Sequence, residues 1–505
     1  MKIEKYHNYL FLILLITLYY ILDFQTILFL PPQGIHFIRQ TDCLSFASNY
    51  FKNGFHFFQP QVFNLQSTDG KAACEFPILY YIAASLYQIF GEKEYILRLI
   101  TVIISSAGFY YLFKLLNTLL KDLVYAIAFS FLFISSTVLL YYTNNFLPDS
   151  SALGLTFIGW YFMFDFINNR EKRNSLIVGY VFFTIASLLK VTYFTNPIAA
   201  ILSIVAYDLS FDRAFKKIIR ANATPIILFF SSFVIILCWN LYVIQYNDRN
   251  HDTYFLIHST PIWRLSIVQI TQVWDLITNY WYSKYYYQST FHLFFIIIVT
   301  GALFFKRMER ILLITSTLSL IGATLYFLLF FAQFSDHDYY FIAIIPAIIF
   351  LVTSTFISLR NRFTRLINNY ITKLLVITIC ILSLNYAREK LIQRYANAND
   401  IYSSIGFKLT GMRVYLDSLE VPQNAKFVIL TDQTMNGGLY FINRPGWVVK
   451  DESEVSLKVI EKYINQDLDF MIVTDSITLN PKFKCKKIGE KNGNLIYKFE
   501  NTSNN

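Results

Sequence analysis

Residues 36–77, HFIRQTDCLSFASNYFKNGFHFFQPQVFNLQSTDGKAACEFP, form a polar segment directly after the first long apolar run of the chain. Charged residues stand near both of its ends: Arg39 and Asp42 at the start, and Glu75 at the end, before Pro77. Most of the remaining sequence has the pattern of apolar helices. Because long loops between such helices are usually functional, we expect this segment to carry the chemistry of the protein.

The composition is that of a polytopic membrane protein. Of 505 residues, 55% are apolar, 18% are aromatic and only 15% are charged, whereas soluble domains have about a quarter charged residues. The mean hydropathy of +0.43 agrees. The net charge of +10 comes from basic residues clustered in short loops between apolar runs. That pattern follows from the positive-inside bias and predicts no nucleic-acid partner.

About eleven apolar runs are long enough to cross a membrane. The first is too long for a signal peptide and has no small-residue cleavage site, so we expect it to be retained. The predicted spans are 9–30, 95–116, 124–143, 148–167, 175–191, 193–209, 224–245, 291–305, 311–331, 339–358 and 372–386. The shorter run 78–90 predicts a helix that lies at the membrane interface or re-enters the bilayer.

The basic residues predict an orientation. With the N-terminus in the cytoplasm, the inner loops carry the lysine and arginine clusters, at 114–121, 170–173, 213–220, 306–310 and 360–373. We therefore predict a multi-pass protein of the inner membrane. Its first polar loop, its aromatic-rich 246–290 loop and its C-terminal part would lie on the periplasmic side. The 246–290 loop is either an aromatic belt or a lid over a lipid groove.

A second kind of sequence begins near Arg388, where apolar runs shorten and charge rises. Its elements alternate in type: strands at 425–432 and 469–475, a helix at 455–466, and a hairpin at 486–500 around Asn492-Gly493. We predict a transmembrane domain, 1–387, with a catalytic first outer loop, 31–94, and a small periplasmic α/β domain, 388–505.

Ionisable residues at the outer ends of spans are the candidate functional residues, because charge at membrane depth is costly. Besides Asp42 and Glu75, they are Asp149 in NNFLPDSS, Lys190 in SLLKVTYFTNP and the segment 337–340 in SDHDYYFIAIIP. All of them fall on one predicted side of the membrane. This convergence points to a fixed, one-sided site.

Each candidate also has a purely structural explanation. Asp149 can cap its helix, and Lys190 can extend to the headgroups. Tyr339 and Tyr340 can be interfacial aromatics, and Arg39 with Asp42 can be an ordinary ion pair. The sequence alone leaves these alternatives open.

As a set, the candidates fit sugar transfer from a lipid phosphate. Such a donor already has a good leaving group, so the reaction needs a carboxylate to accept the proton of the attacking hydroxyl. It also needs positive charge to stabilise the departing phosphate. Asp42 suits the first role, and Arg39 and Lys190 suit the second. Three further side chains offer ligands for an acceptor or a divalent metal ion: Glu75, Asp149 and His337.

The order of these motifs resembles that of bacterial GT-C superfamily glycosyltransferases, such as the lipid A aminoarabinose transferase and the protein O-mannosyltransferases. The resemblance covers roughly residues 1–390. It rests on H-x-x-R-Q-x-D in the first outer loop, followed by E-x-P before a tyrosine-rich helix. It implies a GT-C-like helical membrane fold and a polyprenyl-phosphate sugar as donor. It leaves the acceptor open among lipid, glycan and protein.

The resemblance also assigns roles. Asp42 would be the catalytic base, and Glu75 and Asp149 would match acidic residues of the family's catalytic region. Lys190 would match a lysine that contacts the lipid phosphate, and HDYY at 337–340 would line the donor site. The residues predicted to bind the donor are Arg39, Lys190, Tyr339 and Tyr340.

Two other function classes stay open beside an inverting glycosyltransferase. A lipid-linked saccharide flippase would spread its charges through the membrane depth, whereas here they gather at outer ends. A ligase or polymerase of surface polysaccharide would suit a large outer loop late in the chain. Cys43 and Cys74, which adjoin Asp42 and Glu75, form either a disulfide or two free thiols.

Overall fold

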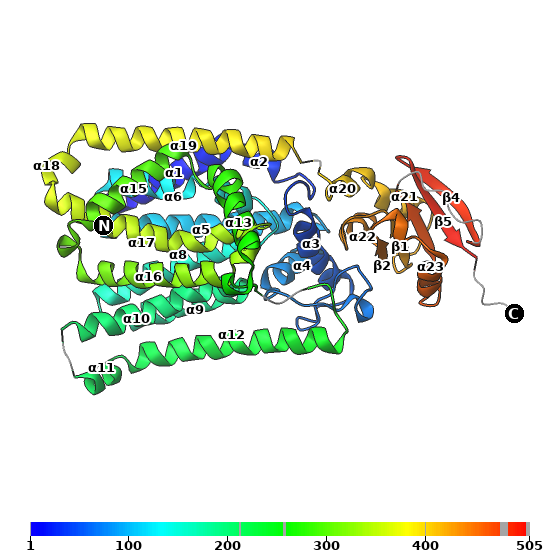
Figure 1. Cartoon of the computed structure of the whole chain (residues 1–505), viewed down its shortest axis with the longest axis horizontal. Helices are drawn as coiled ribbons and strands as arrows, with labels where there is room; N and C mark the ends of the chain where they lie inside the picture. Colours follow the sequence, from blue (N-terminus) through cyan, green and yellow to red (C-terminus); the bar gives the residue numbers. More distant parts are fainter. Residues whose placement is uncertain (1, 212–213, 256–258, 399, 475–482, 501–505) are drawn as a thin grey trace. The chain divides into compact units, whose positions relative to one another are not determined.

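The computed structural model describes residues 2–211, 214–255, 259–398, 400–474 and 483–500. It is mostly helical (Figure 1) and divides into two compact units. The first, here called the helical unit, comprises Met1–Leu28, Arg98–Asn240 and His258–Ile392. The second, the mixed unit, comprises Phe29–Leu97, Leu241–Ile257 and Gln393–Asn505.

Every predicted span falls on a helix or a bent helix pair. These are α1 (Lys2–Ile21), α5 (Tyr95–Leu120), α6 with α7 (Leu123–Ile134 and Thr137–Thr143), α8 (Asp149–Asn168), α9 (Arg173–Leu189), α10 (Thr195–Leu209), α12 (Ala223–Arg249), α15 (Gln288–Ala302), α16 (Arg310–Leu329), η7 with α17 (Asp338–Ile344 and Ile345–Arg362) and α19 (Tyr370–Ala396). Short helices connect them: α2 (Phe24–Ile27), α11 (Phe215–Ala221), α13 (Ile267–Asp275), α14 (Tyr282–Tyr285) and α18 (Thr364–Ile367).

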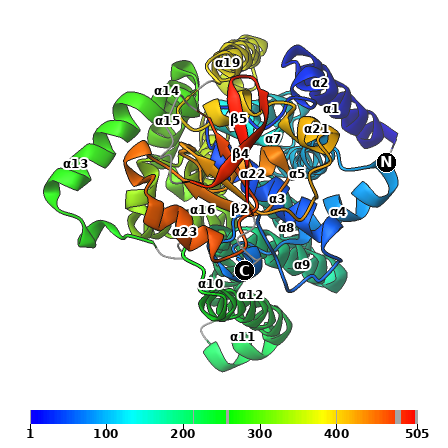
Figure 2. The same ribbon diagram turned by 90° about the vertical axis from the view of Figure 1, so that its right-hand side faces the viewer.

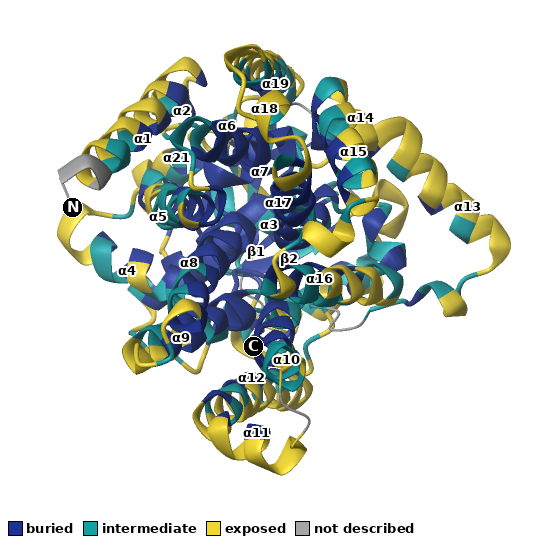
Figure 3. Ribbon diagram, turned by 90° about the vertical axis from the view of Figure 1, so that its left-hand side faces the viewer, coloured by how far each residue is buried: buried dark blue, intermediate teal, exposed yellow. Residues whose placement is uncertain are grey.

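Among the described helices, six are long and apolar enough to cross a membrane, and a seventh span results if α6 and α7, bent by 80°, count as one. The protein is therefore a multi-pass membrane protein. The apolar stretches of α8 and of Asp338–Arg362 are mostly buried, whereas those of α12 and α19 are mostly exposed (Figure 3). Exposed apolar helices of this kind face lipid.

The helices in the middle of the helical unit pack closely. A Cβ atom on Gly108 of α5 would lie 2.1 Å from Cα of Gly154 in α8. Such a contact requires small residues, as is common where membrane helices cross. It places α8, and with it Asp149 at its first turn, in the interior of the unit.

The 246–290 loop is split by its environment. Trp281, Tyr285 and Tyr286 are buried in the helical unit, whereas Trp263 and Trp274 are exposed. Trp274 lies in α13 and Trp263 shortly before it, and α13 lies on the outside of the unit (Figure 3). Whether they form a belt or a lid stays a prediction.

The mixed unit combines the first polar loop with the C-terminal region. The loop contributes α3 (Phe37–Lys52) and α4 (Ile78–Phe90), which pack together, and α4 coincides with the predicted short helix at 78–90. The C-terminal region contains a five-stranded sheet of order β2-β1-β3-β5-β4. Figure 2 shows this region with β2, β4 and β5 labelled. The division predicted at 387/388 stays a prediction.

Three strands are parallel: β1 (Phe427–Leu430), β2 (Gly446–Val449) and β3 (Phe470–Val473). The hairpin of β4 (Cys485–Lys491) and β5 (Asn494–Phe499) adds two antiparallel strands. It turns at Asn492 and Gly493, which both have positive φ, as a two-residue hairpin loop requires. The predicted strands and hairpin are thus confirmed, except that Asp475 lies outside the described residues.

Helices cover both faces of the sheet. On one face lie α20 (Ser404–Lys408), α21 (Met412–Ser418) and α22 (Gly437–Ile442), and on the other lies α23 (Leu457–Ile464). Phe37 of α3 and Phe63 of the first loop belong to the hydrophobic core on the α22 side. The first polar loop therefore completes the core of the C-terminal region.

Candidate active site

Asp42 lies on the second turn of α3, and the backbone before that helix turns sharply. Gly34 and His36 both have positive φ, 68° and 58°. The amide of Gln40 closes the turn by donating to the carbonyl oxygens of Gln33 and Ile35 at 2.8 and 2.9 Å. The turn sets α3 so that Asp42 points inward, and only 1% of this residue is exposed.

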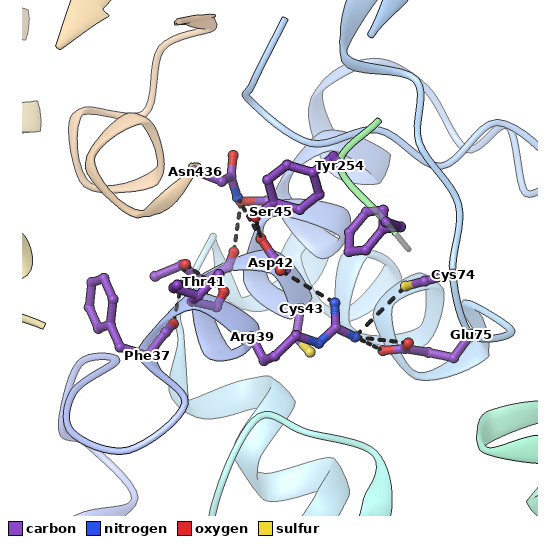
Figure 4. Close-up of polar contacts among 12 residues, drawn as sticks. Phe37, Arg39, Thr41, Asp42, Cys43, Ser45, Cys74, Glu75, Tyr254 and Asn436 are labelled. Carbon is purple, nitrogen blue, oxygen red and sulfur yellow. Dashed lines mark hydrogen bonds and ion pairs between the residues drawn. The ribbon is translucent and has the colours of Figure 1, made fainter. Parts of the chain in front are cut away.

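Three side chains hold the Asp42 carboxylate (Figure 4). The hydroxyl of Tyr254 donates to Oδ1 at 2.5 Å, and Asn436 Nδ2 donates to the same oxygen at 3.3 Å. Arg39 Nη1 donates to Oδ2 at 3.3 Å. Tyr254 and Asn436 lie 212 and 394 residues away in sequence. The carboxylate is therefore held by one residue of its own helix and by two distant segments of the chain.

Burial sets the proton affinity of this carboxylate. It raises the pKa of Asp42 from 3.8 to about 6, against the opposing effects of Arg39, Tyr254 and Asn436. At neutral pH Asp42 is then mostly ionised, yet it binds a proton far more readily than an aspartate in water. A general base works best with a pKa near the working pH, so the site gives Asp42 the properties of one.

Arg39 joins the two predicted carboxylates of the first loop. Its Nη2 donates to both oxygens of Glu75, at 2.8 and 2.9 Å, while its Nη1 contacts Asp42. Tyr80 of α4 donates to Glu75 Oε1 at 2.5 Å. The predicted grouping of Arg39, Asp42 and Glu75 is thus present, and the guanidinium is engaged by the carboxylates. A role of Arg39 in binding the donor phosphate stays a prediction.

The two cysteines beside these carboxylates are free thiols. Cys43 Sγ lies 3.2 Å from the Tyr80 hydroxyl, and Cys74 Sγ lies 3.8 Å from Arg39 Nη2. Burial raises the pKa of Cys43 to about 12, so its thiol is neutral. The backbone next to Cys74 is fixed by Asn247, whose side chain bonds both the N–H and the carbonyl oxygen of Ala73 at 2.8 Å.

Asn436 reaches Asp42 from the loop that follows β1. Its Nδ2 also donates to Ser45 Oγ at 2.8 Å, and its Oδ1 accepts from the backbone N–H of Phe63 at 3.1 Å. The loop is shaped by buried Asp432, which accepts from the Thr434 N–H, the Thr434 hydroxyl and the Gly438 N–H at 2.8, 2.6 and 3.0 Å. A Cβ on Gly438 would lie 2.4 Å from Asp432 Oδ2. Only glycine fits there.

Sequence reasoning missed Tyr254, Asn436 and Tyr80. Asn436 follows a predicted buried strand and precedes Gly-Gly, at the carboxyl edge of a parallel sheet where ligand-binding residues gather, so it had a recognisable signal. Tyr254 was one of many aromatics in its loop, and Tyr80 one of several in its helix. Nothing in the sequence distinguished either.

A second cluster of predicted residues lies in the helical unit. Lys190 Nζ, at the end of α9, lies 3.5 Å from Asp149 Oδ2 and 5.3 Å from the centre of the Tyr339 ring. Tyr193 donates to the backbone carbonyl of Asp149 at 3.0 Å. The predicted convergence of Asp149, Lys190 and Tyr339 is therefore present.

The segment 337–340 completes this cluster. The His337 ring stacks on the rings of Tyr339 and Tyr340 with centroids 5.2 and 5.6 Å apart. Tyr142 of α7 donates to Asp338 Oδ1 at 2.7 Å, and Tyr326 donates to the carbonyl oxygen of Tyr340 at 2.9 Å. These contacts fix a polar, aromatic end on a largely apolar helix.

The predicted metal ligands are divided between the two units. Glu75 belongs to the mixed unit, whereas Asp149 and His337 belong to the helical unit. Within the part of the chain that the structure describes, no three histidine, cysteine or acidic side chains are placed to hold a metal ion. A metal requirement stays a prediction.

A multi-pass helical membrane protein whose polar first loop carries Asp42 and Glu75 is the architecture that the predicted GT-C resemblance implies. Comparisons with known proteins agree. The family model described as dolichyl-phosphate-mannose-protein mannosyltransferase matches residues 74–242. This segment contains Glu75, Asp149 and Lys190 but ends short of Tyr254 and begins after Asp42. Among curated proteins, no sequence matches the chain significantly.

Solved structures match over nearly the whole chain. Apo ArnT from Cupriavidus metallidurans has a TM-score of 0.58 at 12% identity, covering 97% of each chain. The same protein bound to undecaprenyl phosphate has a TM-score of 0.54 at 13% identity, covering 98% of each chain. The oligosaccharyltransferase of Archaeoglobus fulgidus has a TM-score of 0.50 at 13% identity, covering 87% of this chain and 64% of the other. The predicted GT-C resemblance is confirmed, and at these identities the structures establish the fold.

Proposed function

We propose that the protein is an inverting glycosyltransferase that moves a sugar from a polyprenyl-phosphate donor to a hydroxyl group of an acceptor. The observation that carries the proposal is Asp42, a buried carboxylate with a raised pKa that is held by Tyr254, Asn436 and Arg39. The similar ArnT structure contains undecaprenyl phosphate, which supports a lipid-phosphate donor. On the proposed topology, the reaction takes place on the periplasmic face of the inner membrane.

In the proposed reaction, Asp42 accepts the proton of the acceptor hydroxyl as that oxygen attacks the anomeric carbon. The sugar–phosphate bond breaks as the new glycosidic bond forms, and the configuration inverts. Tyr254 and Asn436 keep the carboxylate oriented, so that no reorganisation is needed when charge moves. Arg39 contacts both Asp42 and Glu75 and so connects Asp42 with the end of the first loop.

Lys190 supplies the positive charge for the departing phosphate. Its ammonium lies beside the Asp149 carboxylate and over the ring of Tyr339, so its position is set before the donor binds. Tyr339 and Tyr340 offer apolar faces to the first isoprene units of the lipid. Charge placed in advance in a site of low dielectric stabilises a developing phosphate dianion strongly.

We also propose that a divalent metal ion assists the reaction, with Glu75, Asp149 and His337 as its predicted ligands. Loss of transfer on addition of EDTA, with recovery on Mg²⁺ or Mn²⁺, would support it. Full activity in EDTA would reject it.

The experiment that tests the function is transfer of radiolabelled sugar from polyprenyl-phosphate lipids in isolated membranes. Wild type is compared with Asp42→Asn, and Asp69→Asn is the matched control, because Asp69 is an exposed aspartate of the same loop. We expect wild type and Asp69→Asn to label an acceptor and Asp42→Asn to fail. Transfer by Asp42→Asn at the wild-type rate would remove Asp42 as the base. Lipid movement across the bilayer without transfer would favour a flippase.

A further inference from the structure

The mixed unit contains a polar pocket whose lining does not include Asp42. Its volume is about 340 Å³, within the range of small-ligand sites. The side chains that matter most in its lining are Tyr87, Glu92, Glu94, Arg413, Tyr440 and Phe441. They come from α4, from the segment that follows it, and from α21 and α22, so the pocket joins the first loop to the C-terminal region.

One wall of the pocket is an ordered network of charges. Glu92 accepts from Ser48 of α3 at 2.5 Å and from Arg413 Nη2 at 2.7 Å. Lys52, at the end of α3, lies 3.9 Å from Glu92 and also hydrogen-bonds Asn443. Burial raises the pKa of Glu92, but Lys52 and Arg413 outweigh that effect and hold it below its ordinary value. Donors and acceptors therefore alternate along this wall.

The other wall is aromatic. Tyr440 donates to Glu94 Oε1 at 2.7 Å, which holds its ring at the pocket, and Phe441 follows on the same helix. Tyr87 contributes a third ring. Aromatic rings and charged hydrogen-bonding groups in one pocket suit a ligand with an apolar C–H face and a rim of hydroxyl groups. That description fits a sugar ring.

Other ligand classes fit less well. The lining carries two glutamates against Lys93 and Arg413, and Arg413 is already paired with Glu92, so the pocket offers no excess of positive charge to a phosphate or another anion. A purely apolar ligand would leave the charged wall desolvated without hydrogen bonds, which is costly. A neutral saccharide meets both walls, because its hydroxyl groups both donate and accept.

The pocket shares two helices with the proposed active site. Leu44 and Ser48 follow Asp42 on α3 by two and six residues, which places them on another face of that helix at about 100° per residue. Tyr440 follows Asn436, the residue that holds Asp42, by one turn of α22. A ligand in the pocket therefore lies close to the reacting site without occupying it.

We infer that this pocket binds a neutral sugar unit of the acceptor, and that the acceptor is a glycan or a glycan-bearing molecule. That the bound sugar belongs to the acceptor rests on the proposed function, whereas the binding of a saccharide in the pocket does not. Binding at a distance from the reacting hydroxyl orients the acceptor and contributes to kcat/KM. The pocket thus narrows the choice of acceptor class, which the sequence left open among lipid, glycan and protein.

The test measures saccharide binding directly on the full chain, in lipid nanodiscs so that no sugar-based detergent competes. Saturation-transfer NMR is recorded with glucose, galactose, N-acetylglucosamine and their β1,4-linked disaccharides. Arg413→Gln removes one donor of the polar wall, and Tyr440→Phe removes only a hydroxyl. Lys458→Gln, an exposed change on α23 with the same loss of charge, is the control.

We expect at least one of these sugars to bind wild type and Lys458→Gln, and to bind Arg413→Gln about ten-fold more weakly, as loss of a charge-assisted hydrogen bond predicts. The inference is overturned if no sugar binds the wild-type protein. It is also overturned if Arg413→Gln and Tyr440→Phe both bind the sugars with the wild-type affinity. If sugars bind at the pocket while Asp42→Asn transfers normally, the proposed function fails and the saccharide pocket stands.

Discussion

Replacing Tyr254 by phenylalanine isolates the effect of one hydrogen bond on the pKa of Asp42. The change removes one hydroxyl and keeps the ring, so the packing around Phe255 and α3 is preserved. The lost bond is the shortest one to the Asp42 carboxylate, 2.5 Å from oxygen to oxygen. The hydroxyl stabilises the ionised form, so its removal must raise the pKa of Asp42 above about 6.

The size of the shift follows from the strength of that bond. A hydrogen bond to a charged group contributes about 1.5–3 kcal/mol, and one pKa unit corresponds to about 1.4 kcal/mol. Asn436 and Arg39 remain in place, and water can replace part of the bond. We therefore expect a rise of about one unit.

The assay is the pH profile of sugar transfer between pH 5 and 9. In wild type the rate should fall on the acid side around pH 6, as Asp42 takes up its proton. In Tyr254→Phe the acid limb should move up by about one unit, with little loss at pH 9. The matched control is Tyr246→Phe, because Tyr246 donates to the carbonyl oxygen of Pro60 and not to Asp42.

Two results would contradict this reasoning. If the acid limb of Tyr254→Phe stays at the wild-type pH, the hydroxyl does not tune the group that limits the rate. If the variant loses activity by the same factor at every pH, Tyr254 acts on geometry or on substrate rather than on proton affinity. A shift in the Tyr246→Phe control would show that the limb reports a different group.

Three further predictions follow from the contacts described. Asp42→Asn should raise the thermal stability at pH 8, because the wild-type protein must bury an ionised carboxylate above about pH 6. The stability advantage of the variant should vanish as the pH falls from about 6 to 4, and thermal melts of both proteins at several pH values check this. Lys190→Ala should raise the KM for the lipid donor about ten-fold through loss of one charge-assisted contact, with Lys190→Arg closer to wild type, and an unchanged KM would remove Lys190 from the donor site. Gly438→Ala should lower the free energy of unfolding by about 1–3 kcal/mol, because its Cβ would meet Asp432 at 2.4 Å, whereas Gly322→Ala, whose nearest neighbour would be 3.5 Å away, should be tolerated.

Much of the fold was predictable because it depends on local patterns. Every predicted span is an apolar run of the sequence, and an apolar run of that length predicts a membrane helix by itself. The strands at 425–432 and 469–475 and the hairpin at Asn492-Gly493 follow from composition and turn chemistry in the same way. The bend of 80° between α6 and α7 was not predictable, because both helices are apolar and only Ser135 and Ser136 separate them.

The candidate site was predictable only in part, for a related reason. Arg39, Asp42 and Glu75 stand close together in one loop, and a charged residue in an apolar sequence attracts attention at once. Tyr254 and Asn436 are uncharged and distant in sequence, and they matter only because the fold brings them to Asp42. The grouping of Lys190 with Asp149 and Tyr339 was foreseen as a convergence on one membrane side, but the stacking of the His337 ring on Tyr339 and Tyr340 was not.

The C-terminal region has a role that the sequence did not predict. The sequence indicated a small α/β domain there and no part of the site around Asp42. The structure shows that it helps to build the site: Asn436 bonds Asp42, and Phe37, from the first turn of the helix that carries Asp42, lies in the hydrophobic core beneath the sheet. Burial raises the pKa of Asp42, so this pKa depends on every segment that covers the carboxyl group. The loop after β1 is one of these segments, so the raised pKa is a property of the first loop and the C-terminal region together.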